Sequence, residues 1–353
     1  MKTMPPRAHD LRSEIDQTLA VAGTLANVSP EQALQLAGQA QMLAESIEYH
    51  AGQALALYTQ AAAFSARNAL VDAERMARRA QEMAEAHALW ALWFDTLDLA
   101  SGIAYDLEQY DVAVDGWLKQ LERGFDRDEP LAILRGYLGL GKVFFMYGDL
   151  PTTTAMLEKA REYLPQITRH DVAFGLYINL AADACHHADF SAALKELASA
   201  EALLDEMGYC QYEHELYYYR GHIYRRQGKL HAALRQLERS LALNAGTSNQ
   251  WGRTVNLIEL GETCLDLGQL HAAQYYLNSV EEAPMLYLQM QIHGVLARVS
   301  AAVGRTDREF VHWQKHFALA ERMAEAGAQP HVAKLRGKAL AERMRIVENR
   351  RQA

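Results

Sequence analysis

Small and large apolar residues alternate along this chain in a pattern that is typical of paired helices. Residues 214–240 show it most clearly, with Gly221 inside a first segment, Gly228 between the segments and Ala233 inside a second. Gly221 leaves room for a neighbouring helix to approach, and Gly228 lies where the first helix must end. The stretch therefore predicts a helix, a turn and a second helix that packs on the first.

The same unit recurs every 40 residues, and a fixed period of this kind predicts stacked helical units. We call the small residue of each first helix, equivalent to Gly221, the anchor of its repeat. The anchors are Val21, Ala61, Ser101, Gly141, Ala181, Gly221 and Gly261. Seven residues later, the turn position carries Gly148, Ala188, Gly228 and Gly268. Twelve residues after the anchor come Ala33, Ala73, Ala113, Ala193, Ala233 and Ala273, with Thr153 as the exception.

An eighth unit follows after a step of 36 residues, with Ala297 as anchor, Gly304 at the turn and Glu309 where a small residue is expected. It predicts a degenerate capping repeat. The repeated small and turn positions resemble the tetratricopeptide repeat. This resemblance implies an all-α fold, a right-handed superhelical α-solenoid of about eight helix-turn-helix units plus a C-terminal helix. We expect the solenoid over residues 1–328 and a basic capping or linker helix over residues 329–353.

Proline, glycine and polar clusters mark the expected ends of the helices. The first helix is expected from about Ala8 to Ala26, and the second from Pro30 to about His50, with Ser29 as its cap. Further breaks between units are expected at residues 123–130, 164–165, 207–208, 244–249, 283–284 and 326–330.

The last residues of the chain are basic and carry an apolar stripe. Seven Lys and Arg side chains follow position 331 against only Glu342 and Glu348. The apolar stripe consists of Val332, Leu335, Ala339, Leu340, Met344 and Val347. It predicts either helix pairing in a homodimer or a plain cap on the last repeat, because Glu342 interrupts a clean heptad seam.

Composition narrows the class of protein. Hydrophobic residues make up 50% of the 353 residues and proline only 8 positions, as an all-helical chain requires. A net charge of −9 argues against a nucleic-acid partner, whose phosphates such a surface repels. The three cysteines have no paired spacing, which favours a reducing cytoplasm. The chain shows no signal sequence and no apolar run long enough for a membrane span, so we expect no membrane partner.

Two local motifs suggest chemistry, but their surroundings favour helix packing. Residues 136–143 match part of a phosphate-binding loop, yet Val143 stands where a Mg²⁺-binding hydroxyl is needed, and residues 131–146 read as one helix. Cys185, His186 and His187 are adjacent, so they point in different directions on a helix and predict no metal site. We therefore expect no catalysis, cofactor or metal.

The resemblance implies a concave groove lined by the first helices. Transferred to this chain, the groove positions give candidate binding residues for a protein or peptide partner. The candidates are Asp95, Asp98, Tyr105, Arg135, Lys142, His186, Tyr218, His222, Arg225, Arg226 and Glu262. Acidic residues of the third repeat are expected to face basic ones of the fourth and sixth, and to hold an extended peptide or a helix. The alternative is a solvated inner surface without a ligand.

The 40-residue period and the segments 309–321 and 332–345 are similar to the sensory tetratricopeptide regions that precede GGDEF-type diguanylate cyclase domains in bacteria. No GGDEF motif is present in the chain. The resemblance implies a regulatory or sensory module in bacterial signalling. Two alternatives stay open: a stand-alone adaptor that assembles a multiprotein complex, and an intracellular receptor for a short signalling peptide.

Overall fold

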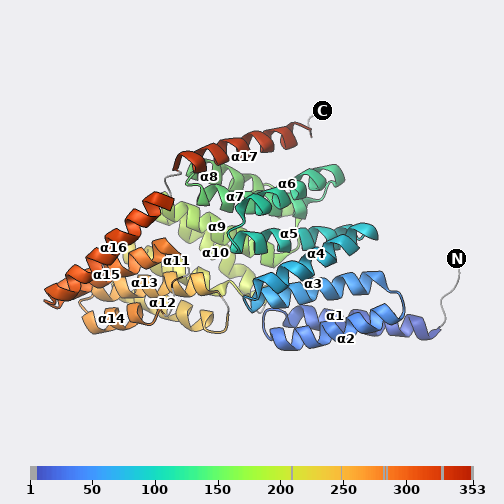
Figure 1. The fold of residues 1–353 in the computed structure, drawn as a ribbon, viewed down its shortest axis with the longest axis horizontal. Coiled ribbons are helices and arrows are strands. Elements are labelled where there is room, and N and C mark those ends of the chain that lie inside the picture. The colour runs from blue at the N-terminus through green and yellow to red at the C-terminus, as the bar shows by residue number, and fades with distance from the viewer. Residues whose placement is uncertain are drawn as a thin grey trace. The chain divides into compact units, whose positions relative to one another are not determined.

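The computed structural model describes residues 6–350, except 208–209, 248, 281–282, 284 and 327–329. Over these residues it is built of α-helices and one short 3-10 helix, without a strand. Successive helices form antiparallel pairs (Figure 1). The predictions of an all-α fold and of about eight helix pairs followed by a C-terminal helix are confirmed.

The chain divides into two compact units, each with its own helix pairs. Unit 1 comprises Met1–Ile167 together with Ala339–Ala353, and unit 2 comprises Thr168–Lys338. That the repeats form one array over residues 1–328 stays a prediction. None of the described helices is long and apolar enough to cross a membrane.

Unit 1 contains four helix pairs. Their bounds are α1 (Pro6–Leu25), α2 (Pro30–Ser46), α3 (His50–Ala66), α4 (Leu70–Ala86), α5 (Trp90–Asp106), α6 (Tyr110–Arg127), α7 (Pro130–Met146) and α8 (Leu150–Arg161), followed by the 3-10 helix η1 (Leu164–Gln166).

Unit 2 contains the other four pairs. They are α9 (His170–His186), α10 (Phe190–Met207), α11 (Glu213–Arg226), α12 (Leu230–Asn244), α13 (Gln250–Asp266), α14 (Leu270–Asn278), α15 (Leu286–Ala302) and α16 (Thr306–Ala326). The C-terminal helix α17 (Pro330–Arg350) begins in the residues of unit 2 and ends in those of unit 1.

The turns repeat every 20 residues, twice as often as the helix pairs. A residue with positive φ stands in each of these turns: Glu48, Asn68, Ala88, Glu108, Asp128, Gly148, Ala188, Gly228 and Gly268. The next N–H donates to the carbonyl five residues back, as from Lys229 to Tyr224 at 2.8 Å. This is the Schellman end of a helix. The predicted turn column is confirmed, and the turns between pairs share its geometry.

The anchors bring paired helices into close contact. A Cβ atom on Gly221 would lie 2.6 Å from Leu237 Cγ, and one on Gly261 would lie 2.7 Å from Leu277 Cγ. All the predicted small positions of the second helices are buried, including Thr153. Helix α7 runs unbroken through residues 136–143, so this stretch is a packing surface and not the strand-to-helix loop that holds phosphate.

The first pair departs from the prediction. Val21 is 52% exposed, whereas Ala22 is fully buried, so the anchor lies one residue later than the period implies. The turn at residues 26–29 has no left-handed residue, which changes the register of α1 relative to the other first helices. Helix α2 ends at Ser46, because His50 already begins α3. Ser29 is the N-cap, but its side chain makes no capping hydrogen bond.

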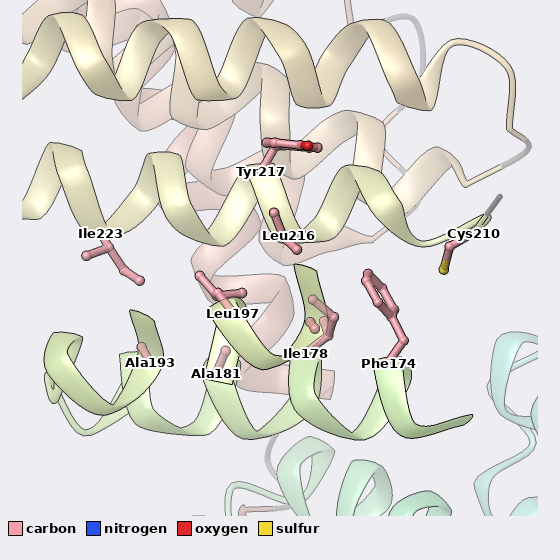
Figure 2. Packing of buried hydrophobic residues seen from close by; sticks show 10 residues of the cluster. Phe174, Ile178, Ala181, Ala193, Leu197, Cys210, Leu216, Tyr217 and Ile223 are labelled. Carbon is pink, nitrogen blue, oxygen red and sulfur yellow. The ribbon is translucent and has the colours of Figure 1, made fainter. Parts of the chain in front are cut away.

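Large residues of the first helices fill the space between successive pairs. In unit 2, Phe174 and Ile178 of α9 pack with Leu197 of α10 and Leu216 of α11 (Figure 2). Small residues such as Ala193 keep the backbones close at the same level. The core therefore continues from one pair to the next within the unit, as expected for stacked repeats. In the last pair, Ala297 is buried and Gly304 has positive φ, as predicted.

Candidate binding surfaces on the first helices

Ion pairs join the first helices of the third and fourth repeats in unit 1. Arg135 on α7 donates from Nη1 to Asp95 Oδ1 on α5 at 2.6 Å. Its Nε lies 3.3 Å from Asp98 Oδ2, and Trp117 Nε1 of α6 donates to Asp98 Oδ1 at 3.2 Å. The Arg135 side chain is only 7% exposed. Two carboxylates therefore hold this guanidinium in a mostly buried position.

The ends of the same two helices carry the other candidates of unit 1. Tyr105 packs edge-to-face on Tyr110, with ring centroids 5.5 Å apart, and lies 6.1 Å from the Trp117 ring. Desolvation raises the pKa of the Asp106 carboxyl, and the positive charge of Lys142 opposes this shift. Lys142 is thus close enough to interact with an acidic group of the neighbouring repeat.

A larger network joins three successive first helices of unit 2. Arg225 on α11 donates to three carboxylates of α13: to Asp266 at 2.8 Å, to Glu262 at 2.6 Å and to Glu259 at 3.2 Å. Arg298 on α15 donates to the other oxygen of Glu262 at 2.9 Å. We call these five residues, with His222, the unit 2 network.

Glu259 is the buried centre of the unit 2 network, with 6% of its surface exposed. Burial by itself raises its pKa, but the hydrogen bond and charge of His222, 3.2 Å away, and the Arg225 guanidinium outweigh burial, so the pKa is lowered. Although burial opposes it, the surrounding carboxylates raise the pKa of Arg225. These groups therefore stabilise one another in their charged forms.

Aromatic and histidine side chains border the network. Tyr218 stacks on His222 with ring centroids 6.5 Å apart. Desolvation, with a smaller contribution from Glu259, raises the pKa of the Tyr218 hydroxyl well above its usual value. Burial lowers the pKa of His186 on α9, and the charge of Asp183 opposes the shift.

The structure brings together only some of the candidate residues. Within unit 1 it joins Arg135 to both aspartates, and within unit 2 it joins His222, Arg225 and Glu262. Arg226 is exposed and takes no part in the described unit 2 network. Because the third and sixth repeats belong to different units, the opposition expected between them stays a prediction, as does the use of either face for binding.

Sequence reasoning missed Glu259 and Arg298 as members of the network. Glu259 lies two residues before its anchor, outside the positions that the resemblance assigns to the groove. One signal was present, a single carboxylate within the otherwise apolar run of residues 257–260. A charge in such a run requires a partner when it is buried.

Metal and thiol chemistry find no arranged site in the part of the chain that the structure describes. No three His, Cys, Asp or Glu residues there are grouped to hold a metal ion. Burial raises the pKa of Cys185 and of Cys210 to about 12, so both thiols remain protonated near neutral pH. Cys264 is buried in the core, as the sequence predicted.

No protein-family model matches the chain, and no curated protein sequence matches it. Solved structures do. A Rap protein complexed with competence and sporulation factor has a TM-score of 0.58 at 13% identity, covering 89% of this chain and 99% of its own. The apo form of RapI gives 0.54 at 13%, covering 79% and 98%. An IFIT1 monomeric mutant with Gppp-AAAA gives 0.51 at 13%, covering 98% and 84%.

These likenesses, together with the repeated helix pairs, define the chain as a tetratricopeptide-like α-solenoid. At 13% identity they establish the fold alone.

Proposed function

We propose that this protein is a non-catalytic scaffold that binds a protein or peptide segment on the faces of its first helices. The observation that carries the proposal is the unit 2 network, which extends over α11, α13 and α15 and is bordered by Tyr218. An extended segment or a helix has the length to contact several successive repeats, whereas a small molecule does not.

The chemistry of the two clusters favours a partner that brings hydrogen-bond donors. Arg225 is already occupied by three carboxylates, and Arg135 by two. A carboxylate accepts several hydrogen bonds, so Glu262 and Asp266 retain acceptor capacity after pairing with arginine. Backbone N–H groups or a basic side chain of the partner complement this surface better than an acidic partner does.

The net charge supports a protein partner over a nucleic acid. The whole chain carries −9, and the clusters on the first helices contain at least as many carboxylates as arginines. Binding of nucleic acid gains most of its affinity from the neutralisation of phosphates by Lys and Arg. The solved structure with Gppp-AAAA shares the fold with this chain, so charge rather than fold supports the choice.

We place this scaffold in bacterial signalling, as a cytoplasmic regulatory or sensory module, on the resemblance to the repeats that precede GGDEF-type domains. The structure of a Rap protein with competence and sporulation factor favours, as second candidate, an intracellular receptor for a short signalling peptide. A stand-alone adaptor is the third. In each case binding controls an output only if the partner has different affinities for two conformations of the scaffold.

A matched pair of tyrosine variants tests the proposed surface. Tyr218→Ala alters the face of the first helices, whereas Tyr275→Ala removes a 68% exposed ring from the second helix α14. The immobilised wild type and both variants are incubated with lysate of the source cells, and retained species are identified by mass spectrometry. We expect a partner that is lost with Tyr218→Ala and retained with Tyr275→Ala. Equal retention by both variants contradicts binding on this face.

A further inference from the structure

The end of α17 packs on unit 1. Leu340, Met344 and Val347, spaced by four and three residues, turn one helix face inward and are each less than 9% exposed. Figure 1 shows this helix, in red, alongside α7 and α8. Ile346, on the same segment, points outward and is 47% exposed. We call residues 339–350 the C-terminal segment.

Polar contacts fix the register of the C-terminal segment. Glu348 Oε1 accepts hydrogen bonds from Tyr137 Oη of α7 at 3.0 Å and from Lys159 Nζ of α8 at 2.6 Å. Arg343 Nη2 donates to Asp115 Oδ1 of α6 at 2.6 Å. One carboxylate and one guanidinium, five residues apart, are therefore read by opposite charges on three different helices.

The surface beneath the segment is aromatic and comes from the same three helices. The Tyr137 ring lies 6.3 Å from Phe125 at the end of α6 and 6.4 Å from Tyr163 after α8, and Lys159 lies over its face. We call Tyr137, Lys159, Asp115 and these two rings the receiving surface. It is separate from the ion pairs of Asp95, Asp98 and Arg135.

We propose that the receiving surface is a docking site for an amphipathic helix of a partner protein, and that the C-terminal segment is its resident occupant. The partner helix has large apolar residues at positions i, i+4 and i+7, a carboxylate at i+8 and a basic residue at i+3. This pattern follows from the contacts of Leu340, Arg343, Met344, Val347 and Glu348.

The contacts of the resident segment are suited to exchange. Arg343 and Asp115 are 51% and 67% exposed, and Lys159 and Glu348 are 37% and 28% exposed. Ion pairs this accessible to water contribute about 0 to 1 kcal/mol each, so they set register more than affinity. Three apolar side chains supply most of the attraction, and a partner helix with equal or larger side chains at those positions competes for the same place.

A labelled synthetic peptide of residues 337–350 is the probe, and the full chain is the receptor. Met344→Asp weakens the resident segment by placing a charge in its buried stripe, whereas the control Ile346→Asp places the same charge on its exposed side. We expect the peptide to bind Met344→Asp at least ten-fold more tightly than it binds wild type or Ile346→Asp. Equal affinity for all three receptors overturns the proposal, provided that circular dichroism shows unchanged helix content.

A charge reversal tests the location of binding. Lys159→Glu, added to Met344→Asp, is expected to weaken peptide binding, and a peptide with Glu348→Lys is expected to restore it. Binding that is unaffected by Lys159→Glu overturns the receiving surface as the site. Sedimentation of the wild type gives the remaining outcome, because a dimer that dissociates with Met344→Asp identifies a second copy, rather than a partner protein, as the occupant.

Discussion

Single residues in the turns determine how sharply each helix ends. The left-handed position recurs every 20 residues, and only some of its occupants are glycine. Ala188 holds φ 56° there and Gly228 holds φ 74°. A residue with a Cβ atom is strained in this region by about 1 kcal/mol or more, whereas glycine is not.

Exchanging these two residue types tests the strain. Ala188→Gly is expected to raise the free energy of unfolding by about 1 kcal/mol, and Gly228→Ala to lower it by a similar amount. No side chain would meet a Cβ atom at Gly228, so the second change acts through the backbone alone. Urea unfolding followed by circular dichroism measures both. A gain of stability with Gly228→Ala contradicts the strain argument.

His214 links stability to pH. Its side chain is buried, its Nδ1 lies 3.0 Å from Gln211 O, and Asn249 Nδ2 donates to its Nε2 at 3.1 Å. Burial lowers its pKa to about 4, and the hydrogen bond to Gln211 opposes this only in part. The folded state therefore favours the neutral ring, whose stabilising contribution is complete above the unfolded pKa of about 6.5 and is lost as pH falls towards 4.

We expect His214 to cost about 2 kcal/mol of stability between pH 7 and pH 5. Urea unfolding of the wild type and of His214→Gln at both pH values isolates the effect, because the variant has no titrating ring. The loss on acidification is expected to be smaller in the variant by about this amount. The same pH dependence in both proteins would assign acid sensitivity to other groups.

Between elements, the closeness of paired helices depends on what stands opposite each anchor. A Cβ atom on Gly141 would meet its nearest neighbour, Leu157 Cδ2, at 3.4 Å, which is an ordinary contact. On Gly221 the nearest atom, Leu237 Cγ, is only 2.6 Å away. The two glycines occupy the same repeat position but differ in their need for glycine.

Alanine at the two anchors should therefore have different effects. Gly221→Ala is expected to destabilise the protein by about 1 to 3 kcal/mol through overpacking, less whatever Leu237 recovers by moving. Gly141→Ala is expected to be near neutral or slightly stabilising, since alanine favours the helix. Thermal and urea unfolding compare them directly. Equal losses would mean that helix packing at the anchor is uniform along the chain.

The helices themselves were predictable because the 40-residue period combines turn, anchor and small-residue positions, each repeated several times. The 20-residue spacing of the turns was not, since Glu48, Glu108 and Asp128 carry no signal for a left-handed backbone. The pairing of Arg135 with Asp95 follows from their separation of one period. Glu259 was missed because its position in an apolar run is typical of a core residue, and only its partners on α11 explain it.

At the scale of the whole molecule, stacked repeats make stability local. Each unit has its own buried clusters, such as the one around Phe174 in unit 2 and the one around Leu57 and Ile103 in unit 1. In a repeat protein, each pair is stabilised mainly by its neighbours, so damage in one pair spreads over a limited distance. A core substitution in unit 2 should therefore leave the helices around Leu57 protected.

Hydrogen exchange of Gly221→Ala measures how far the damage spreads. We expect faster exchange of backbone amides in α11 and α12, which lose their close packing, and in neighbouring helices of unit 2. Amides of α3 to α6 in unit 1 are expected to keep wild-type rates, because their core is built from other residues. A uniform increase across both units would instead show that the chain unfolds as one cooperative structure, and each helix pair would then depend on all the others.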